Sequence, residues 1–361
     1  MHIAVIGDAH IGARPYNLDS RELDFINSFK DAVGKVDGNV PIVIAGDLFN
    51  APRPKAELVY LVEQTLKNHT VFGIVGNPQH DASGSDWLRL CNITLLTQSQ
   101  TIPRSKGRPV VIAGLNWTKP DMFMTELDLL LSTIKGPLDI LVLHQLINEF
   151  ISYDLNQISG AEIAKRLKPF GTKVVVMGDL HQSVNLTIDS VQFIYTGSVD
   201  VNSISEDCNK SFVMLDISDD AEPTISFNRV PIKTRPFVHT LIQTEQDIDK
   251  ILMGVYALPP FFILEYNNED KEVVKLIDSK LTGKHLYRLL PIVKDSKSNL
   301  FKQMSSSDAD RRDSMKHLRD SIVLFFEPNT DEYNLILQLL ELPDEVPALV
   351  TAYTKSKGLN L

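Results

Sequence analysis

The sequence contains only two cysteines, Cys91 and Cys208, in 361 residues. Two cysteines cannot form a disulfide framework, and neither lies in a cysteine-rich cluster, so both are interpreted as thiols rather than metal ligands. The sequence also lacks any run of about 18 apolar residues, the length that a transmembrane helix requires. Residues 1–8 read as a first core strand and lack the layout of a signal peptide. These absences predict a cytoplasmic protein with no membrane partner.

Positive charge is scarce as well, because 46 acidic residues against 36 basic ones give a net charge of −10. This balance argues against a protein that wraps nucleic acid unaided. It is compatible with an enzyme whose metal ions contact one phosphate, or with one that a partner holds on nucleic acid. The small basic clusters at 104–108 and 165–168 are interpreted as ordinary solvated surface. The substrate-binding residues are therefore unknown.

Strand-like and helical runs alternate up to about Ile217, and the later strand-like runs follow without long helices between them. This order favours a layered α/β sandwich over a doubly wound sheet. Asp19 or Ser20 is expected to cap the first helix. The helices are expected at Ser20–Val33, Lys55–Asn68, Asp121–Ile134 and Gly160–Lys168.

The pattern changes between Val230 and Phe237, where two prolines flank a basic segment. The small domain that follows should run strand, helix, strand, helix, with Thr244 capping its first helix. Near the C-terminus, 307–326 reads as an amphipathic helix. Tyr333–Leu342 is apolar almost all round, so it either packs on its own domain or docks on another chain. We therefore expect a main domain over 1–235, a small α+β domain over 236–303 and C-terminal helices over 304–361.

Five short polar motifs each follow an apolar run that reads as a buried strand. Ligands at the carboxyl ends of neighbouring strands converge in space although they lie far apart in the sequence. Each motif alone is a common loop start, but five in this order are hard to explain structurally. They are Asp8-Ala9-His10, Gly46-Asp47, Gly76-Asn77, Leu143-His144-Gln145 and Gly178-Asp179-Leu180-His181.

The five motifs together supply the donors of a site for two divalent metals. Asp47 can bridge two cations with its two carboxylate oxygens. A mixture of carboxylates and imidazoles suits Mn²⁺, Fe²⁺ or Zn²⁺ better than Mg²⁺ or Ca²⁺, which prefer all-oxygen ligands. The candidate ligands are Asp8, His10, Asp47, Asn77, His144, Asp179 and His181.

Several motifs also carry a family resemblance. Near the start of the chain, Asp8-Ala9-His10-Ile11-Gly12 forms a D-x-H-x-G motif, and Gly46-Asp47-Leu48-Phe49 lacks the D-R-G continuation that is typical of protein phosphatases. Leu143-His144-Gln145, Tyr195-x-Gly197-Ser198 and Arg235-Pro236-Phe237 follow. With these motifs, residues 1 to about 237 resemble the calcineurin-like metallophosphoesterases. More narrowly, they resemble the nuclease subunit of the SbcC–SbcD type double-strand-break repair complex, a group that includes phage recombination nucleases.

The chain departs from that family's pattern at two places. The usual G-N-H-D is here Gly76-Asn77-Pro78-Gln79-His80-Asp81, with two additional residues before the histidine. If the added pair bulges outward, His80 and Asp81 still return to the site. The usual G-H-x-H is here Gly178-Asp179-Leu180-His181. An aspartate in place of a histidine keeps a ligand but hardens it and adds negative charge.

The resemblance implies a metal-dependent DNA exonuclease, with endonuclease activity left open, that hydrolyses phosphodiester bonds with two metal ions. Mn²⁺ is the expected ion and Mg²⁺ the second candidate. His80 would stabilise developing charge or protonate the leaving oxygen, and Asp81 would orient it. By the same resemblance, Asp8, His10, Asp47 and His181 would hold one metal, and Asp47, Asn77, His144 and Asp179 the other.

The resemblance also implies partners. They are double-stranded DNA ends, an SbcC-type coiled-coil ABC ATPase docked on residues 307–342, and a second copy of the chain. The small domain would correspond to a capping domain over the nuclease site, and a phage protein would act in the host cytoplasm. Two other functions stay open: a phosphoesterase of the same fold that acts on small phosphodiesters or phosphoproteins, and a non-catalytic subunit that tethers DNA ends or assembles the ATPase.

Overall fold

The computed structural model describes residues 1–81, 84–150, 158–204, 206–256, 258–267, 271–282 and 285–292. It divides the chain into two compact units, Met1–Val293 and Lys294–Leu361. The predicted C-terminal helices and the predicted boundary at residue 303 lie outside the described residues. Within those ranges, no helix has the length and apolar character needed to span a lipid bilayer.

The first of two large sheets is built around the N-terminal strand. Its strands from β1 to β4 run parallel, and β11 and β12 extend it antiparallel on the other side of β1. The strand order is β12 (Ile225–Pro231), β11 (Ser211–Ile217), β1 (His2–Ile6), β2 (Ile42–Ala45), β3 (Val71–Ile74) and β4 (Thr94–Leu95).

The second large sheet also has six strands, in a different arrangement. Its four central strands run parallel, and one antiparallel strand closes each edge. The order is β5 (Gln100–Ile102), β6 (Val110–Gly114), β7 (Ile140–His144), β8 (Val174–Gly178), β10 (Val191–Tyr195) and β9 (Asn185–Ile188).

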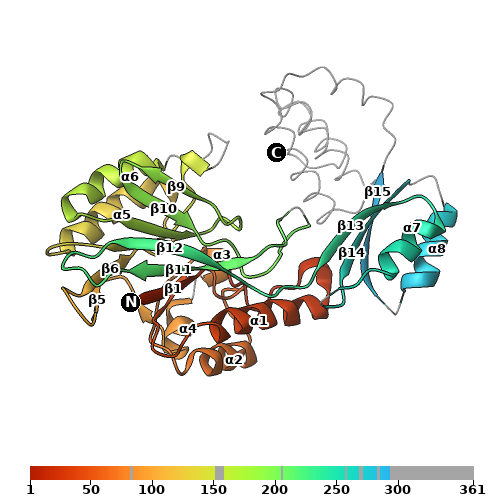
Figure 1. The fold of residues 1–361 in the computed structure, drawn as a ribbon, viewed down its shortest axis with the longest axis horizontal. Coiled ribbons are helices and arrows are strands. Elements are labelled where there is room, and N and C mark those ends of the chain that lie inside the picture. The colour runs from red at the N-terminus through yellow and green to blue at the C-terminus, as the bar shows by residue number, and fades with distance from the viewer. Residues whose placement is uncertain are drawn as a thin grey trace, which may run out of the picture. The chain divides into compact units, whose positions relative to one another are not determined.

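The two sheets pack face to face, and helices cover both outer faces (Figure 1). The predicted layered α/β sandwich is therefore confirmed. Short 3₁₀ turns occur at Pro15–Asn17, Asn148–Phe150 and Lys168–Phe170. The first sheet carries α1 (Asp19–Gly34), α2 (Ala56–Leu66) and α4 (Gly84–Leu90), and the second carries α5 (Pro120–Thr133) and α6 (Gly160–Leu167).

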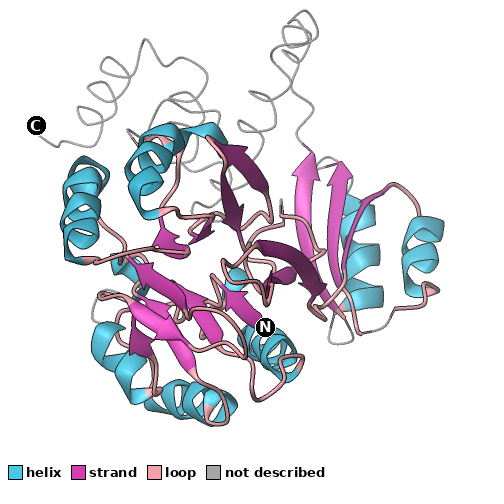
Figure 2. Cartoon of the chain, turned by 60° about the vertical axis from the view of Figure 1, so that its left-hand side comes forward, coloured by secondary structure: helices cyan, strands magenta, loops and turns pink. Residues whose placement is uncertain are grey.

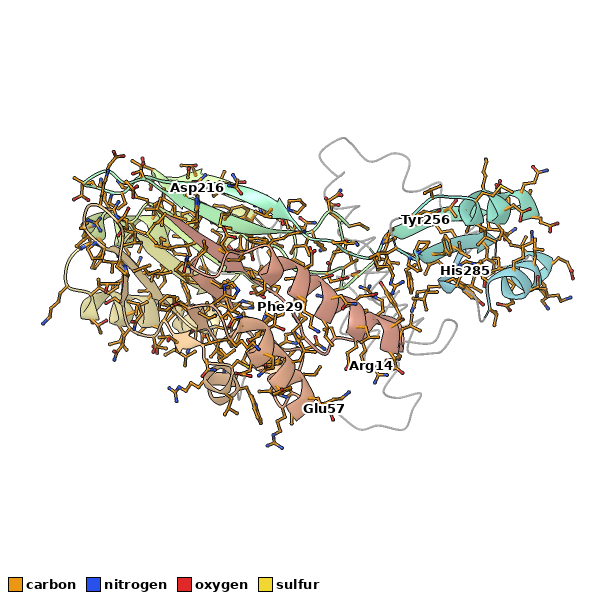
Figure 3. All side chains as sticks on the ribbon, turned by 60° about the horizontal axis from the view of Figure 1, so that its bottom comes forward. Arg14, Phe29, Glu57, Asp216, Tyr256 and His285 are labelled. Atoms are coloured by element: carbon orange, nitrogen blue, oxygen red, sulfur yellow. The ribbon has the colours of Figure 1, made fainter. Side chains whose placement is uncertain are left out.

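Strand β1 shows why these strands read as continuous apolar runs. Ile3 and Val5 join the core between the two sheets, whereas Ala4 and Ile6 join the core under α1. Phe29 of α1 is fully buried in that second core (Figure 3). Because side chains alternate between the faces of a strand, a strand covered on both sides must be apolar at nearly every position.

The four predicted helices are confirmed within a few residues at each end. The predicted cap of α1 was wrong, because Leu18 precedes the helix and no side chain caps it. Asp19 and Glu22 instead lie in the first turn, where carboxylates interact favourably with the helix dipole. Strands β4, β5, β6 and β9 were not predicted.

The small domain over Phe237–Ile292 has one more strand than predicted. It comprises β13 (Phe237–Ile242), α7 (Glu245–Leu252), β14 (Phe261–Asn267), α8 (Lys271–Leu281) and β15 (Leu286–Ile292). Its three strands are all parallel, so it is an α/β unit where the sequence predicted α+β. The predicted division at 235/236 falls in the connection between β12 and β13, which belong to different sheets, and stays a prediction.

The small domain has its own core. Both helices pack on the face of the sheet that carries Phe262 and Leu264 (Figure 2). The rings of Tyr256 and His285 flank Phe262, with centroids 6.2 and 5.7 Å from its own (Figure 3). The cap predicted at Thr244 is present, since Asp247 accepts the Thr244 backbone N–H at 2.8 Å.

A buried ion network joins α1 to the loop after β10 and to the connection that leads into the small domain. The guanidinium of Arg21 is fully buried and donates to Asp24 at 2.5 Å and to Asp200 at 2.7 Å. Arg235 donates to both oxygens of Asp24, at 2.7 and 2.8 Å. Ser28 Oγ donates to Asp200. Two cations therefore balance two anions inside the protein.

Replacing Asp200 with alanine is expected to lower the free energy of unfolding by about 3–5 kcal/mol, because it leaves the buried Arg21 charge only partly compensated. Urea denaturation followed by circular dichroism measures this. Asp216→Asn, at the partly exposed pair with His2, is the control and should change the value by less than about 1 kcal/mol. Equal stability of the two variants would contradict the interpretation.

Candidate metal centre

The seven predicted ligands come together where the carboxyl ends of five parallel strands meet. Asp8 and His10 follow β1, and Asp47 follows β2. Asn77 follows β3 in the same sheet, and His144 ends β7 in the facing sheet. The last two ligands, Asp179 and His181, come just after β8. The structure thus gathers residues that lie up to 173 positions apart in the sequence.

One half of the cluster contains Asp8, His10 and His181, whose donor atoms lie within 4.8 Å of one another. The Nε2 atoms of the two imidazoles are 3.1 Å apart. The backbone N–H of Asp179 donates to both carboxylate oxygens of Asp8, at 3.0 and 3.2 Å. The first and fifth motifs are therefore tied together directly.

The other half surrounds Asp47. Its Oδ2 lies 3.4 Å from His144 Nε2 and 3.9 Å from His10 Nε2, and its Oδ1 accepts the Asn77 backbone N–H at 2.6 Å. The Asn77 amide faces Asp179 Oδ1 at 2.8 Å and His144 Nε2 at 3.5 Å. A half-turn of that amide exchanges its nitrogen for its oxygen. Asp47 thus stands between the two halves, as a bridging ligand requires.

The backbone is strained at four of the seven candidate ligands. Asp8, His10, Asp47 and Asp179 have φ values of 48°, 43°, 48° and 83°, in the left-handed region that non-glycine residues seldom adopt. Strain of this kind costs about 1–3 kcal/mol per residue and is concentrated at functional sites. Gly76 allows the close approach, because a Cβ there would lie 2.1 Å from Asp47 Oδ1.

Two imidazoles are oriented by bonds on their outer side. His144 Nδ1 is 2.7 Å from the Ala45 carbonyl oxygen, and His181 Nδ1 is 2.9 Å from Glu206 Oε1. Both acceptors require Nδ1 to carry the proton, so both Nε2 atoms turn a lone pair toward the carboxylates. Lone pairs and carboxylates that face one another need a cation between them. The donor set therefore fits divalent metal ions.

Electrostatics support the same conclusion. Burial raises the pKa of Asp8 to about 7, and Asp47 and Asp179 add to the rise while histidines oppose it. Burial alone would lower the pKa of His144, but Asp47 beside it raises that pKa to about 10. The carboxylates at this place therefore favour positive charge close to them, which protons supply here and a bound metal cation would supply in their stead.

The two additional residues before His80 form a helical turn rather than displacing it. In α3 (Pro78–Asp81), the backbone N–H groups of His80 and Asp81 both donate to the Asn77 carbonyl, at 2.9 and 2.8 Å. The turn brings His80 Nε2 to 4.0 Å from Asp47 Oδ2. His80 also packs edge-on against His10, with ring centroids 4.7 Å apart. His80 therefore lies beside the candidate ligands, and its donor atom and those of His10 and Asp47 lie within 4.8 Å of one another.

Asp81 was expected to orient His80, but its carboxylate makes other contacts. Its carboxylate is buried and accepts the backbone N–H groups of Leu48, Phe49 and Gly76, at 3.2, 3.3 and 3.1 Å. Within the described residues, Nδ1 of His80 has no hydrogen-bond partner. Asp81 thus ties the loop of Asp47 to the loop of Asn77, and no hydrogen bond supports the predicted orientation of His80.

Sequence reasoning missed the acidic residue behind His181. Glu206 lies in the loop after β10 and accepts from Lys210 Nζ at 2.7 Å. Burial would raise the pKa of Glu206, but His181 and Lys210 lower it to about 2. No motif or periodicity in the sequence singles out Glu206. The motif Tyr195-x-Gly197-Ser198 at the start of the loop carries only the family resemblance, and its Tyr195 hydroxyl donates to the Gln145 carbonyl at 2.7 Å.

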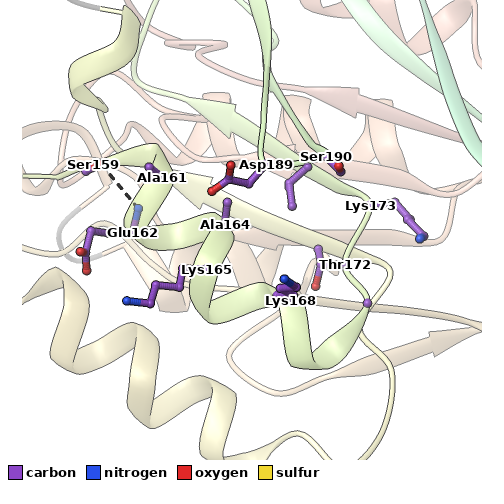
Figure 4. A pocket seen from close by; sticks show the side chains of 12 residues that line it. Ser159, Ala161, Glu162, Ala164, Lys165, Lys168, Thr172, Lys173, Asp189 and Ser190 are labelled. Carbon is purple, nitrogen blue, oxygen red and sulfur yellow. Dashed lines mark hydrogen bonds between the residues drawn. The ribbon is translucent and has the colours of Figure 1, made fainter.

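A separate pocket lies beside α6 (Figure 4). Lys165, Lys168 and Lys173 line it together with Glu162 and Asp189, so its charge is mixed. Lys173 precedes β8, whereas the metal ligands follow the far end of that strand. The pocket is therefore distinct from the metal centre.

Comparisons with known proteins show similarity to DNA repair proteins of archaea. The DNA double-strand break repair protein Mre11 of Methanococcus maripaludis is 27% identical over 285 residues, covering 69% of this chain and 72% of that protein. The Methanosarcina mazei protein of the same name is 29% identical over 245 residues, covering 64% of this chain but 38% of that protein. Phosphopantetheinyl hydrolase of Mycobacterium tuberculosis is a weaker structural match (14% identity, TM-score 0.37, 55% of this chain and 89% of that one) and supports no inference.

The family assignment comes from a direct match. Residues 1–183 match the family described as calcineurin-like phosphoesterase. That range holds all five motifs and both halves of the ligand cluster. Because the match covers just over half of the 361 residues, the chain belongs to the calcineurin-like phosphoesterases.

Proposed function

We propose that this chain is a metal-dependent DNA nuclease that works in double-strand-break repair or recombination. The observation that carries the proposal is the convergence of seven candidate ligands from five strand ends, with His80 Nε2 4.0 Å from Asp47 Oδ2. The similarity to archaeal repair proteins supports DNA as the substrate. The same proposal places its action in the cytoplasm.

The two halves of the cluster suggest how the metals would be shared. Asp8, His10, Asp47 and His181 would hold one ion, and Asp47, Asn77, His144 and Asp179 the other. When bound, two divalent cations would neutralise charge on a phosphodiester and lower the pKa of a water molecule toward neutrality. Mn²⁺ suits this mixture of imidazoles and carboxylates, and Mg²⁺ is the second candidate.

The protein's own contribution to bond cleavage would come from His80. Its Nε2 faces the cluster beside Asp47, and the α3 turn fixes its backbone. From that place a protonated imidazole can stabilise charge on the phosphoryl group or donate a proton to the leaving oxygen. Asp81 would act indirectly, by holding the loops of Asp47 and Asn77 at a fixed separation.

The small domain is a candidate capping domain because it contacts the loop that leaves the metal centre. Tyr16, six residues after His10, stacks on Phe261 of β14 with ring centroids 5.3 Å apart. Arg288 of β15 lies over the same Tyr16 ring at 5.0 Å. A substrate that displaced the small domain would therefore also shift the segment that carries Asp8 and His10.

The proposal includes two protein partners. An SbcC-type coiled-coil ATPase would dock on residues 307–342, and its basic surface would offset the net charge of −10. A second copy of the chain would pack on the main domain. Tyr60 of α2 and Leu90 of α4 are 66% and 58% exposed on neighbouring helices, which supports an apolar contact there.

The test measures release of nucleotides from linear duplex DNA by the full chain, with and without a coiled-coil ATPase. We expect release that requires Mn²⁺, stops when a chelator is added, and increases with the ATPase. Hydrolysis of a small phosphodiester without DNA cleavage in any combination would favour a small-molecule phosphoesterase. Binding of DNA ends without hydrolysis of either substrate would favour a tethering subunit.

A further inference from the structure

Glu206 makes two different sets of contacts with its two carboxylate oxygens. Oε2 is surrounded by donors, namely Lys210 Nζ at 2.7 Å, the Asn202 backbone N–H at 3.2 Å and Ser198 Oγ at 3.4 Å. Oε1 faces His181 Nδ1 at 2.9 Å. The donors around Oε2 anchor the carboxylate, so Oε1 is held against the imidazole.

Asn202 competes for the same ring atom. Its side-chain Nδ2 lies 3.4 Å from His181 Nδ1, and an N–H donor there would favour the tautomer that carries its proton on Nε2. Glu206 is closer and is an acceptor, so it favours a proton on Nδ1 instead. Only that tautomer leaves the Nε2 lone pair free to bind a metal.

We propose that Glu206 is a positioning residue, whose carboxylate holds the His181 imidazole in the metal-binding tautomer and orientation. The inference rests on the proposed two-metal function. His144 is oriented by a neutral carbonyl of Ala45, so the two halves of the centre differ in how their histidines are supported. A carboxylate partner also makes an imidazole a stronger metal donor. The half with Asp8, His10 and His181 therefore depends on Glu206.

Glu206→Gln tests the positioning role, because the donors around Oε2 fix the orientation of the new side-chain amide. Lys210 and its neighbours require an oxygen at the Oε2 position, so the amide nitrogen is turned toward His181 Nδ1. That donor favours the wrong tautomer. The variant keeps the volume of the side chain while reversing the contact that positions His181.

The experiment titrates Mn²⁺ into the metal-free full chain and measures unbound Mn²⁺ by electron paramagnetic resonance. We expect two sites in the wild-type chain, and in Glu206→Gln one site weakened about 10–100-fold, as is typical for loss of a residue that orients a ligand. Glu206→Asp, which is too short to keep the Oε1 contact, should weaken the same site and serves if Glu206→Gln does not fold.

A control variant separates the positioning role from general damage to the fold. Glu149→Gln alters a carboxylate that accepts the Gly160 and Ala161 backbone N–H groups at 2.8 and 3.1 Å, and should leave both Mn²⁺ sites unchanged.

Wild-type affinity at both sites in Glu206→Gln would overturn the inference, and so would equal weakening by Glu149→Gln. These Mn²⁺-binding measurements need no DNA. Failure of the nuclease assay alone would therefore contradict the proposed function without contradicting the positioning role of Glu206. A wild-type chain that binds no Mn²⁺ would overturn both.

Discussion

Asp47→Asn is expected to abolish metal-dependent DNA cleavage. Asp47 Oδ2 faces three imidazoles, those of His144, His10 and His80, at 3.4, 3.9 and 4.0 Å. In the variant, the amide oxygen continues to accept the Asn77 backbone N–H, so the amide nitrogen faces the position of the metals. Metal ions supply several kcal/mol of charge stabilisation in such reactions, so losing them should cost about 10³-fold or more in rate.

The measurement pairs DNA cleavage under single-turnover conditions with Mn²⁺ titration of the same sample. Both Mn²⁺ sites should weaken together, because Asp47 is the ligand that the two halves would share. Asp37→Asn, on the exposed surface after α1, provides a control that should behave as wild type. Retention of cleavage at saturating Mn²⁺ by Asp47→Asn would contradict the bridging role.

His80→Ala should separate metal binding from turnover. His80 stands beside the ligand cluster and is absent from the proposed ligand set, so both Mn²⁺ sites should keep their affinity. Loss of acid–base assistance should lower the cleavage rate by about 10²–10⁴-fold. His2→Ala, on a side chain that is 58% exposed and pairs with Asp216, is the matched control. Near-normal DNA cleavage by His80→Ala would rule out the catalytic role.

A second substrate identifies which role His80 has. A p-nitrophenyl phosphodiester has a leaving group that departs without protonation, so His80→Ala should cleave it almost as fast as the wild-type chain does. An equal loss on both substrates would point to stabilisation of charge on the phosphoryl group instead.

The main fold and the ligand positions were predictable because one pattern encodes both. The strands that carry Asp8, Asp47, Asn77, His144 and Asp179 are buried on both faces, which makes them apolar runs, and each ends where polar residues begin. The carboxyl-end rule for parallel strands then places those polar residues together. Nothing beyond local sequence was needed for that inference.

The missed features depend on contacts between distant residues. Glu206 contacts His181 across 25 positions, and Asp81 contacts Leu48 across 33. Arg21 meets Asp200 across 179 positions. In each case the residue would look like an ordinary loop or surface residue in a sequence, because its partner is set by the tertiary fold. Strand β15 was missed for a related reason, since its place in the sheet comes from pairing with β14.

The wide separation of the ligands along the chain also has a consequence for folding kinetics. His10 and His181 meet only after both six-stranded sheets have formed and packed on each other, and parallel strand pairing with such long chain loops is slow to form. The complete metal centre cannot exist in an early intermediate. Tight binding of Mn²⁺ should therefore appear late during refolding, and the metal would select the finished sandwich from states in which only one sheet has formed.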